Sequence, residues 1–195
     1  MNLFGRSNFI RIYDNALTKK ECDILISTFE KSEKIPGTLY RDDEIVEDHS
    51  YKKCIEMPDL KFSNGLSIDN IIKHSLIKCG EKYVNTYKGS FFNLSPWELD
   101  DIYSFQKYET EDDGFKKWHT EHGPSPIPAK RILAWMFYLN NAKSGTDFLN
   151  FPNVRAKMGR CVIWPAAWTH VHRGVTPNKG LKYIITGWVS FKNEK

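Results

Sequence analysis

From Leu94 onward the chain is a succession of short runs rich in β-branched and aromatic residues, separated by glycine, proline and asparagine. The runs are DIYSFQKY, FKKWHTE, RILAWMFYLN, TDFLNF, GRCVIWP and KYIITGWVSF. Such residues favour strands, and short strands with frequent turn signals are typical of a β-sandwich or barrel. The second half of this 195-residue chain is therefore expected to form a β-rich core.

The first half predicts helices instead. FIRIYDN has the pattern of a short strand, and T-K-K-E at residues 18–21 is a capping box, which marks the start of a helix. Two series of apolar residues then recur at helical spacing, and the second predicts a helix from Ser67 toward Tyr87. The first series is Cys22, Leu25, Ile26 and Phe29, and the second is Ile68, Ile72, Leu76, Cys79 and Tyr83.

Between these helices lies the segment GTLYRDDEIVEDHSYKKC, residues 37–54, which is polar and strongly charged. Its composition favours a solvated loop. A lid over a substrate site, built around residues 41–53, is the alternative.

Composition narrows the partners and the compartment. The net charge of +4, from 28 basic and 24 acidic residues, is too mild to indicate nucleic acid or a membrane as the main partner. No segment approaches the ~20 apolar residues of a membrane span, and MNLFGRSNFIRIYDN lacks the apolar stretch of a signal peptide. The scattered cysteines form no CxxC pair, so we expect reduced, buried thiols and a cytoplasmic protein. They are Cys22, Cys54, Cys79 and Cys161.

The stretch KKWHTEHG, residues 116–123, places a carboxylate between two histidines. In a strand, alternate side chains share a face, so His119 and Glu121 would point the same way and His122 would point away. A third ligand is available in WTHVHRG, from His170 or His172. Two histidines and one carboxylate form the facial triad of non-haem Fe(II) oxygenases. The alternative is that these are polar residues of the surface or core.

Lys182 follows His172 by ten residues, with Gly174 and Gly180 between them. Apolar residues come directly after Lys182, which predicts a buried strand. An unpaired buried lysine is costly, and an anionic ligand would compensate that cost. Both His170 and His172 stay open as the distal ligand at this point. A solvated lysine is the alternative.

Taken together, His119-x-Glu121, His172 and Lys182 resemble the Fe(II)/2-oxoglutarate-dependent dioxygenases, in particular the prolyl 4-hydroxylase-like branch. Other stretches are similar to that branch in the same order: YDNALTKKECDILI, RILAWMFYLNN, SGTDFLNF, MGRCVIWP and HRGVTPNKGLKYIITGW. The sequence departs from the branch at Glu121, where aspartate is usual, and at Ser144, where glycine is usual. The segment YETEDDGFKKWH is also longer than usual.

This resemblance implies an α+β, mainly β fold: a double-stranded β-helix, or jelly roll, with supporting N-terminal helices. It implies one domain over residues 1–195. Residues 1–92 would give helical support and the charged loop, and residues 93–195 would give the jelly-roll core that carries the site. The implied cofactors are Fe(II), the co-substrate 2-oxoglutarate, O₂ and ascorbate.

The resemblance also implies a role for individual residues. The iron ligands and catalytic centre would be His119, Glu121 and His172. Lys182 would bind the C5 carboxylate of 2-oxoglutarate beside the hydroxyl of Tyr138, with Thr186 assisting, and Tyr108 would lie near the other end of the co-substrate. The substrate contacts would be Trp188, Arg131 and Arg173, with surface roles as the alternative for the two arginines.

The function that follows is hydroxylation of a C–H bond in a prolyl or peptide substrate, or in a small amino-acid-like one, with release of succinate and CO₂. The partner would be a peptide, a protein or a small molecule. Two alternatives are a catalytically inactive binding module on the same fold and a nucleic-acid dealkylase of the same superfamily. The mild charge disfavours the dealkylase.

Overall fold

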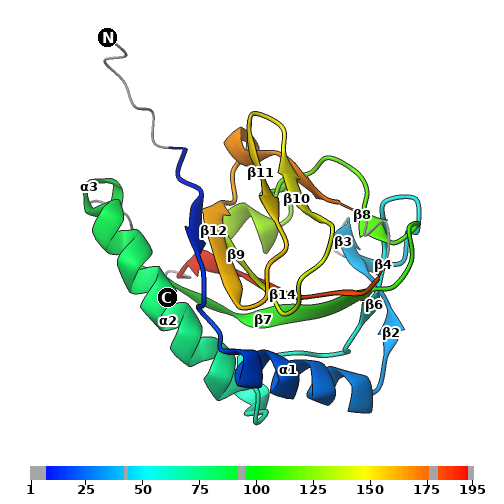
Figure 1. Cartoon of the computed structure of the whole chain (residues 1–195). Coiled ribbons are helices and arrows are strands. Elements are labelled where there is room, and N and C mark those ends of the chain that lie inside the picture. The colour runs from blue at the N-terminus through cyan, green and yellow to red at the C-terminus, as the bar shows by residue number, and fades with distance from the viewer. Residues whose placement is uncertain (1–7, 42–43, 92–94, 176–179, 193–195) are drawn as a thin grey trace.

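The computed structural model describes residues 8–41, 44–91, 95–175 and 180–192. The remaining residues include all of MNLFGRS and parts of the charged segment and of HRGVTPNKG, so expectations for those positions lie outside the described residues. The described chain forms two antiparallel sheets that face each other (Figure 1). This mainly β architecture confirms the jelly roll that the resemblance implies, and it agrees with the β-sandwich or barrel that the short strands predict.

The larger sheet has seven strands in the order β1-β12-β9-β14-β7-β6-β2. Their bounds are β1 Arg11–Tyr13, β2 Ile35–Pro36, β6 Ile55–Glu56, β7 Trp97–Tyr108, β9 Arg131–Tyr138, β12 Arg160–Pro165 and β14 Lys182–Phe191. The smaller sheet has the order β11-β10-β13. It contains β10 Gly145–Phe148, β11 Phe151–Arg155 and β13 His172–Gly174. Two further pairs are β3 Leu39–Arg41 with β4 Glu44–Val46, and β5 Lys52–Lys53 with β8 Gly114–Phe115.

Helices cover the outer face of the larger sheet (Figure 1). They are α1 Lys19–Lys31, α2 Asp69–Thr86 and α3 Lys88–Phe91, and short 3-10 turns occupy Phe62–Asn64, Pro128–Lys130 and Trp168–His170. The capping box is confirmed: the Glu21 amide donates to Thr18 Oγ1 at 3.2 Å, and the Thr18 amide donates to Glu21 Oε2 at 2.7 Å. Helix α2 begins two residues after Ser67.

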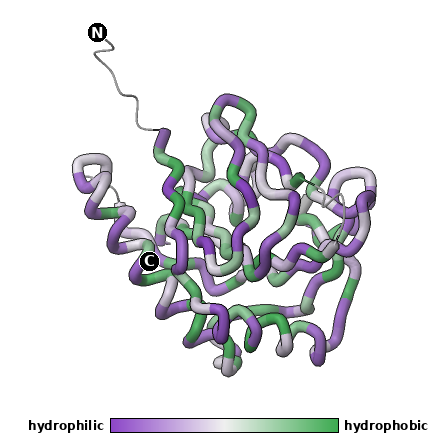
Figure 2. The backbone as a smooth tube through the Cα atoms, viewed as in Figure 1, coloured by the Kyte–Doolittle hydropathy of each residue, from purple (hydrophilic) through white to green (hydrophobic). Residues whose placement is uncertain are grey.

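The alternation of side chains along each central strand builds two cores. On the helix side, Phe29 of α1 packs against Phe105 of β7 with ring centroids 4.7 Å apart. Burial of such a side chain contributes about 1.5–3 kcal/mol. Polar and apolar residues are interleaved along the chain in Figure 2, as this one-sided burial requires. The second core lies between the sheets, where Phe148 packs edge-on against Trp164.

The same alternation decides which residues of β14 enter the space between the sheets. Tyr183 and Ile185 belong to the helix-side core, whereas Ile184 belongs to the core between the sheets. Lys182 and Thr186 therefore point between the sheets too, because successive side chains of a strand alternate.

The predicted strand FKKWHTE is wrong beyond its first residue. Strand β8 ends at Phe115, which pairs with Lys52, the first residue of its two-residue partner β5. The chain then reaches the smaller sheet, and His119 makes an isolated bridge with His172. The expected alternation of one continuous strand therefore does not set the direction of Glu121.

The N-terminal half contributes more than helices and a loop. Strands β1, β2 and β6 extend the larger sheet, with β1 at one edge and β2 at the other. The charged segment is also not simply a solvated loop, because Lys52 is only 4% exposed and pairs with Glu56 at 2.6 Å. The sequence of this segment shows its charges but not their partners.

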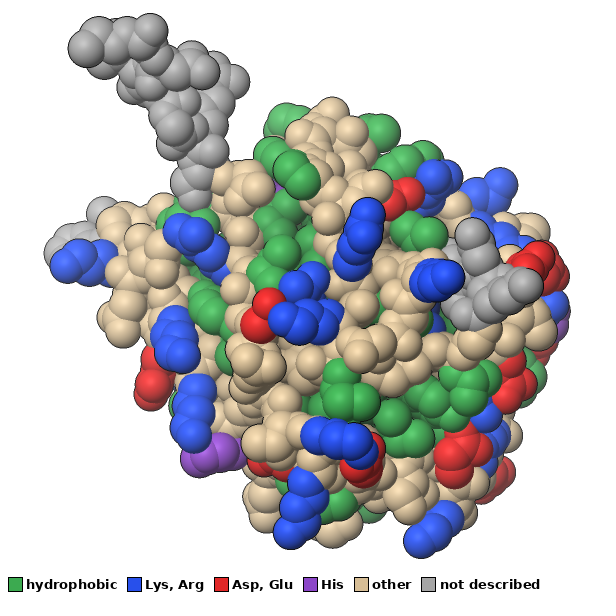
Figure 3. Space-filling model, in the orientation of Figure 1, with side chains coloured by type: hydrophobic (Ala, Val, Ile, Leu, Met, Phe, Trp, Pro, Cys, Tyr) green, Lys and Arg blue, Asp and Glu red, His purple; other side chains and the backbone are tan. Residues whose placement is uncertain are grey.

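The surface and the thiols agree with the composition. All four cysteines are free and buried, as expected. Basic and acidic side chains are interspersed on the face shown in Figure 3. Within the described residues, none of the helices has the length and apolar character needed to cross a membrane.

Candidate metal centre and co-substrate pocket

A cavity of about 670 Å³ opens between the two sheets. Its lining includes His119, Glu121 and His172, and also Lys182 of β14. The charged segment contributes Lys52 and several neighbours to the same lining. The cavity therefore combines the residues that the sequence predicted for metal and co-substrate with a segment expected to be solvated.

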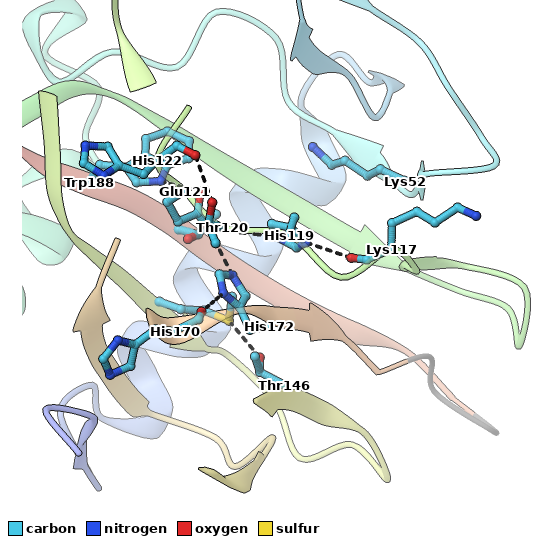
Figure 4. A network of polar contacts seen from close by, with 12 residues as sticks. Lys52, Lys117, His119, Thr120, Glu121, His122, Thr146, His170, His172 and Trp188 are labelled. Atoms are coloured by element: carbon cyan, nitrogen blue, oxygen red, sulfur yellow. Dashed lines mark hydrogen bonds and ion pairs between the residues drawn. The ribbon is translucent and has the colours of Figure 1, made fainter. Parts of the chain in front are cut away.

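His119, Glu121 and His172 form the cluster of potential metal ligands in the described part of the chain (Figure 4). One ligand atom from each lies within 4.8 Å of the others. Oε1 of Glu121 is 3.2 Å from Nε2 of His172 and 4.0 Å from Nε2 of His119. The structure thus brings together the three residues that the sequence singled out.

Backbone pairing holds the two imidazoles side by side. The amides of His119 and His172 each donate to the other residue's carbonyl at 2.9 Å. Nδ1 of His119 lies 2.9 Å from the Lys117 carbonyl, and Nδ1 of His172 lies 2.9 Å from the His170 carbonyl. A carbonyl can only accept, so each Nδ1 carries the proton. Both Nε2 atoms face Glu121 and are the atoms available to a metal, and Nε2 of His172 lies within hydrogen-bond distance of Oε1 of Glu121.

The pKa shifts of His119 and Glu121 favour binding of a cation by this cluster. Burial lowers the pKa of His119 to about 4, and repulsion from His172 acts in the same direction. Burial alone would raise the pKa of Glu121. The hydrogen bond from His172 and the nearby charge of Arg131 outweigh burial and hold that pKa well below its usual range. One neutral imidazole and one carboxylate, with a second imidazole beside them, fit a divalent metal such as Fe(II).

Neighbouring side chains fix the orientation of the cluster. Nε1 of Trp188 donates to Oε2 of Glu121 at 2.7 Å, and the guanidinium of Arg131 lies over the Trp188 ring at 3.6 Å. The ring of Phe115 stacks on His119 with centroids 3.6 Å apart. Glu121 is therefore held through one oxygen, and its other oxygen faces the histidines.

The two alternative histidines lie elsewhere. Nε2 of His170 is 2.7 Å from the carbonyl of Asn8, and its ring points away from His172 (Figure 4). Nε2 of His122 is 2.7 Å from the carbonyl of Ala129. Neither belongs to the cluster of potential ligands.

Lys182 is a buried cation in this cavity. It is 2% exposed, its Nζ donates to the Val175 carbonyl at 2.8 Å, and it lies 4.2 Å from the centre of the Tyr108 ring. Among the described residues no carboxylate forms an ion pair with it. Burial lowers its pKa to about 8, although Cys54 opposes this effect. An ammonium without a counter-charge fits an anionic ligand.

Of the other predicted co-substrate residues, Tyr108 contacts Lys182 and Thr186 also lines the cavity, whereas Tyr138 does not belong to the lining. Each of the three has a protein partner. The hydroxyl of Tyr138 lies 2.6 Å from that of Thr146, which lines the cavity. Thr186 donates to the Trp135 carbonyl at 2.8 Å, and Tyr108 donates to Gln106. Thr146 was missed by sequence reasoning.

The predicted substrate residues separate into two groups. Arg131 and Trp188 line the cavity beside Glu121. Arg173 does not belong to its lining, because its guanidinium pairs with Asp147 at 3.3 Å and lies over the ring of Trp118. The expected contact of Arg173 with a substrate therefore has no support in this geometry.

Further polar residues of the lining were missed, among them Lys52, Glu56, Ser104 and Gln106. Alternation along DIYSFQKY places Ser104, Gln106 and Tyr108 on one face, and this signal was available in the sequence. For Lys52 and Glu56 the sequence held no comparable signal.

Comparison with known proteins supports this description. The family model described as the 2OG-Fe(II) oxygenase superfamily matches residues 103–190. No curated protein matches the chain.

Several solved structures share the fold. A viral collagen prolyl hydroxylase from Paramecium Bursaria Chlorella virus-1, in complex with 2-oxoglutarate, is 15% identical with a TM-score of 0.63, covering 96% of this chain and 98% of that one. A Pseudomonas putida prolyl-4-hydroxylase is 14% identical with a TM-score of 0.67, covering 96% and 95%. A Trichoplax adhaerens prolyl hydroxylase, in complex with a hypoxia inducible factor peptide, is 16% identical with a TM-score of 0.71, covering 94% and 84%.

The fold and the His-x-Glu…His cluster are compatible with a non-haem iron oxygenase. The region that matches the 2OG-Fe(II) oxygenase superfamily includes the three residues of the cluster and Lys182, and prolyl 4-hydroxylases are among the structural neighbours of the chain. Fe(II) and 2-oxoglutarate are the cofactors typical of this superfamily.

Proposed function

We propose that this protein is an Fe(II)- and 2-oxoglutarate-dependent dioxygenase that hydroxylates a C–H bond of a prolyl or peptide substrate, or of a small amino-acid-like one. The observation that carries the proposal is the set of residues that line one cavity. Three potential metal ligands converge in it, and Lys182 lies buried in it without a counter-charge. We further propose that residues 1–195 form a single domain.

In this proposal the metal is held by His119, Glu121 and His172. Both histidines would offer Nε2 to the metal, which would replace the hydrogen bond between His172 and Glu121, and Glu121 would supply the negative charge. Fe(II) bound here supplies the redox chemistry that couples decarboxylation of 2-oxoglutarate by O₂ to hydroxylation, releasing succinate and CO₂. Ascorbate is the proposed auxiliary reductant.

The co-substrate would lie with its C5 carboxylate at Lys182. The carboxylate would supply the negative charge that Lys182 lacks, and the ammonium would donate a charge-assisted hydrogen bond to it. Tyr138 would reach the same carboxylate beside Thr146, with Thr186 nearby. Because Lys182 contacts the ring of Tyr108, we propose that Tyr108 lies at this end of the co-substrate and not at the other end, where the resemblance implied it. These side chains orient the co-substrate and exclude water from the deep end of the cavity.

The substrate would enter beside Trp188 and Arg131, which line the cavity next to Glu121. The prolyl hydroxylases among the structural neighbours support a prolyl or peptide substrate through fold alone. The free space of the same cavity also suits a small molecule.

A second candidate is a binding module that has kept the fold and lost catalysis. The observation in its favour is Glu121, because the branch that the chain resembles usually has aspartate there. Glutamate offers the same oxygen donor, and its geometry in the cluster supports ligation.

The test is anaerobic addition of Fe(II) and then 2-oxoglutarate, followed by the metal-to-ligand charge-transfer absorbance and by succinate release after O₂ is admitted. The proposal expects both the absorbance band and a slow release of succinate without substrate. A band without any succinate, whatever the substrate, would identify the binding module. Absence of the band would reject both candidates.

A further inference from the structure

One wall of the cavity consists of polar side chains that the proposed metal and co-substrate sites do not use. It comprises Lys52 of β5, Glu56 of β6, and Ser104 and Gln106 of β7, and all four line the cavity. Lys52 is 4% exposed, and Glu56 and Gln106 are each 5% exposed. We call these four residues the polar wall. Charged groups are rarely buried this deeply unless they are paired or have a function.

The polar wall is a connected hydrogen-bond network. Nζ of Lys52 donates to Glu56 Oε1 at 2.6 Å, and the Ser104 hydroxyl donates to the same oxygen at 2.7 Å. The Gln106 amide donates to the Ser104 hydroxyl at 3.0 Å. The network therefore runs without a break from β5 to β7 and has a fixed orientation.

The hydrogen bonds of the wall leave donors without a partner among the described residues. An ammonium has three N–H groups, and Lys52 uses two of them within the described residues, on Glu56 and on the Thr38 carbonyl at 2.8 Å. A carboxamide has two N–H groups, and Gln106 uses one. The wall thus offers one spare donor from Lys52 and one from Gln106.

Arg131 adds a further spare donor in the same cavity. Its Nε is buried and has no hydrogen-bond partner in the structure. Its ion-pair partner within the described residues is Glu121 at 3.8 Å, whose charge the proposed metal also uses. Asp100 attracts Arg131 only from a longer distance.

Spare buried donors discriminate between substrates. A ligand that covers them with an apolar ring leaves them without a partner, which lowers its affinity by about ten- to hundred-fold. A ligand with carbonyl or carboxylate oxygens satisfies them. A pyrrolidine ring has no such acceptor, whereas carboxylate and carboxamide side chains do.

We propose that the polar wall is the substrate subsite, and that the side chain presented for hydroxylation carries a carboxylate or carboxamide rather than a prolyl ring. This inference rests on the proposed dioxygenase function and names its substrate class. Lys52 and Gln106 would donate to the oxygen of that group. The substrate is then a free acidic or amide amino acid, or the same residue within a peptide.

The test uses the Fe(II) protein with saturating 2-oxoglutarate and a panel of candidate substrates. The panel contains L-aspartate, L-asparagine, L-glutamate and L-glutamine, the same four residues in short blocked peptides, and L-proline with a prolyl peptide as comparison. We expect at least one acidic or amide compound to raise succinate release at least fivefold and to perturb the anaerobic charge-transfer band. The free and peptide arms identify which source is used. Higher kcat/KM for proline or the prolyl peptide would overturn the inference.

Variants of the polar wall test its role directly. Lys52→Met should raise KM for the responsive compound at least tenfold and leave the Kd for 2-oxoglutarate within about twofold. The matched control is Lys53→Met on the same strand, because Lys53 pairs with Asp112 instead of lining the cavity. The double variant K52M/E56Q, checked by thermal unfolding, separates loss of the donor from the cost of leaving Glu56 unpaired. An unchanged KM in both folded variants would contradict the proposed subsite.

The dioxygenase function and the substrate subsite can be rejected by different results. If the charge-transfer band does not form with 2-oxoglutarate, the dioxygenase function fails and the subsite fails with it. If the band forms and no acidic or amide compound has any effect, the subsite alone is wrong.

Discussion

The indole of Trp188 donates a hydrogen bond to Oε2 of Glu121 at 2.7 Å, and the guanidinium of Arg131 covers the same indole at 3.6 Å. Glutamate has one more rotatable bond than aspartate and is harder to hold in one orientation. The indole fixes one oxygen and directs the other toward His172. Partners of this kind orient metal ligands in many sites.

Trp188→Phe should therefore weaken Fe(II) binding while keeping the aromatic ring. Loss of a partner that orients a metal ligand typically costs roughly ten- to hundred-fold in metal affinity or activity. The measurement is an anaerobic Fe(II) titration of the metal-free protein. Trp168→Phe is the control, because Trp168 is 78% exposed and does not line the cavity. Equal affinities in the two variants would show that the indole does not position Glu121.

The two histidines of the distal stretch should respond differently to substitution. His172→Ala removes a ligand and should abolish both tight Fe(II) binding and turnover. His170→Ala should keep most of the metal affinity, because its Nε2 bonds to the Asn8 carbonyl instead. The reverse ranking in a metal titration would mean that His170 is the distal ligand.

The role of Glu121 as a ligand can be tested by shortening its side chain and by removing its charge. Glu121→Asp keeps the oxygen donor and should retain part of the iron binding. Glu121→Ala removes the only anionic ligand of the cluster and should abolish coupled hydroxylation. Product formation and succinate release are measured together, since coupling is their ratio. A wild-type rate in Glu121→Ala would exclude this carboxylate as a required ligand.

The sequence predicted the fold well where patterns are local. The capping box at Thr18 and the apolar run after Lys182 depend on neighbouring residues, and both have the expected structure, a helix start and a buried strand. The convergence of His119 and Glu121 was expected from a continuous strand, which is wrong. They converge because His119 pairs with His172, a partner more than fifty residues away.

The polar wall shows what a single sequence cannot supply. Lys52 lies in a segment whose composition favours solvent, and its burial depends on three partners. These are the carboxylate of Glu56, the carbonyl of Thr38 and the short pairing of β5 with β8. Ser104 and Gln106 lie at alternate positions of DIYSFQKY, but the cavity that they face is lined in part by that same charged segment. Charge counting along the chain cannot distinguish a paired buried lysine from a solvated one.

Lys182→Ala should selectively weaken 2-oxoglutarate binding. A charge-assisted hydrogen bond contributes roughly 1.5–3 kcal/mol, so the Kd should rise about ten- to hundred-fold or more. Fe(II) affinity should change much less, because Lys182 is not one of the three clustered ligands. Tyr138→Phe should cost less, since it removes one neutral donor and keeps the ring. Titration of the anaerobic Fe(II) protein with 2-oxoglutarate measures each Kd, and an unchanged Kd in Lys182→Ala would place the co-substrate elsewhere.

The affinity for 2-oxoglutarate should also fall as the pH rises above about 8. Burial lowers the pKa of Lys182 to about 8 in the free protein. Below that pH the ammonium is already charged and binds the C5 carboxylate directly. Above it the amine is neutral, so binding must take up a proton. The affinity should then decrease by about tenfold per pH unit until the pKa of the bound form is reached.

Lys182→Arg is the control for this pH dependence. This variant should bind 2-oxoglutarate more weakly at neutral pH, because the fork of the guanidinium needs a different pocket. Its affinity should not change between pH 7 and 9, because a guanidinium stays protonated throughout that range. The measurement is the anaerobic charge-transfer titration repeated at pH 7, 8 and 9 for both proteins. If the wild type and Lys182→Arg lose affinity in parallel, the titrating group is not Lys182. A loss confined to the wild type would identify its ammonium as the group that holds the co-substrate.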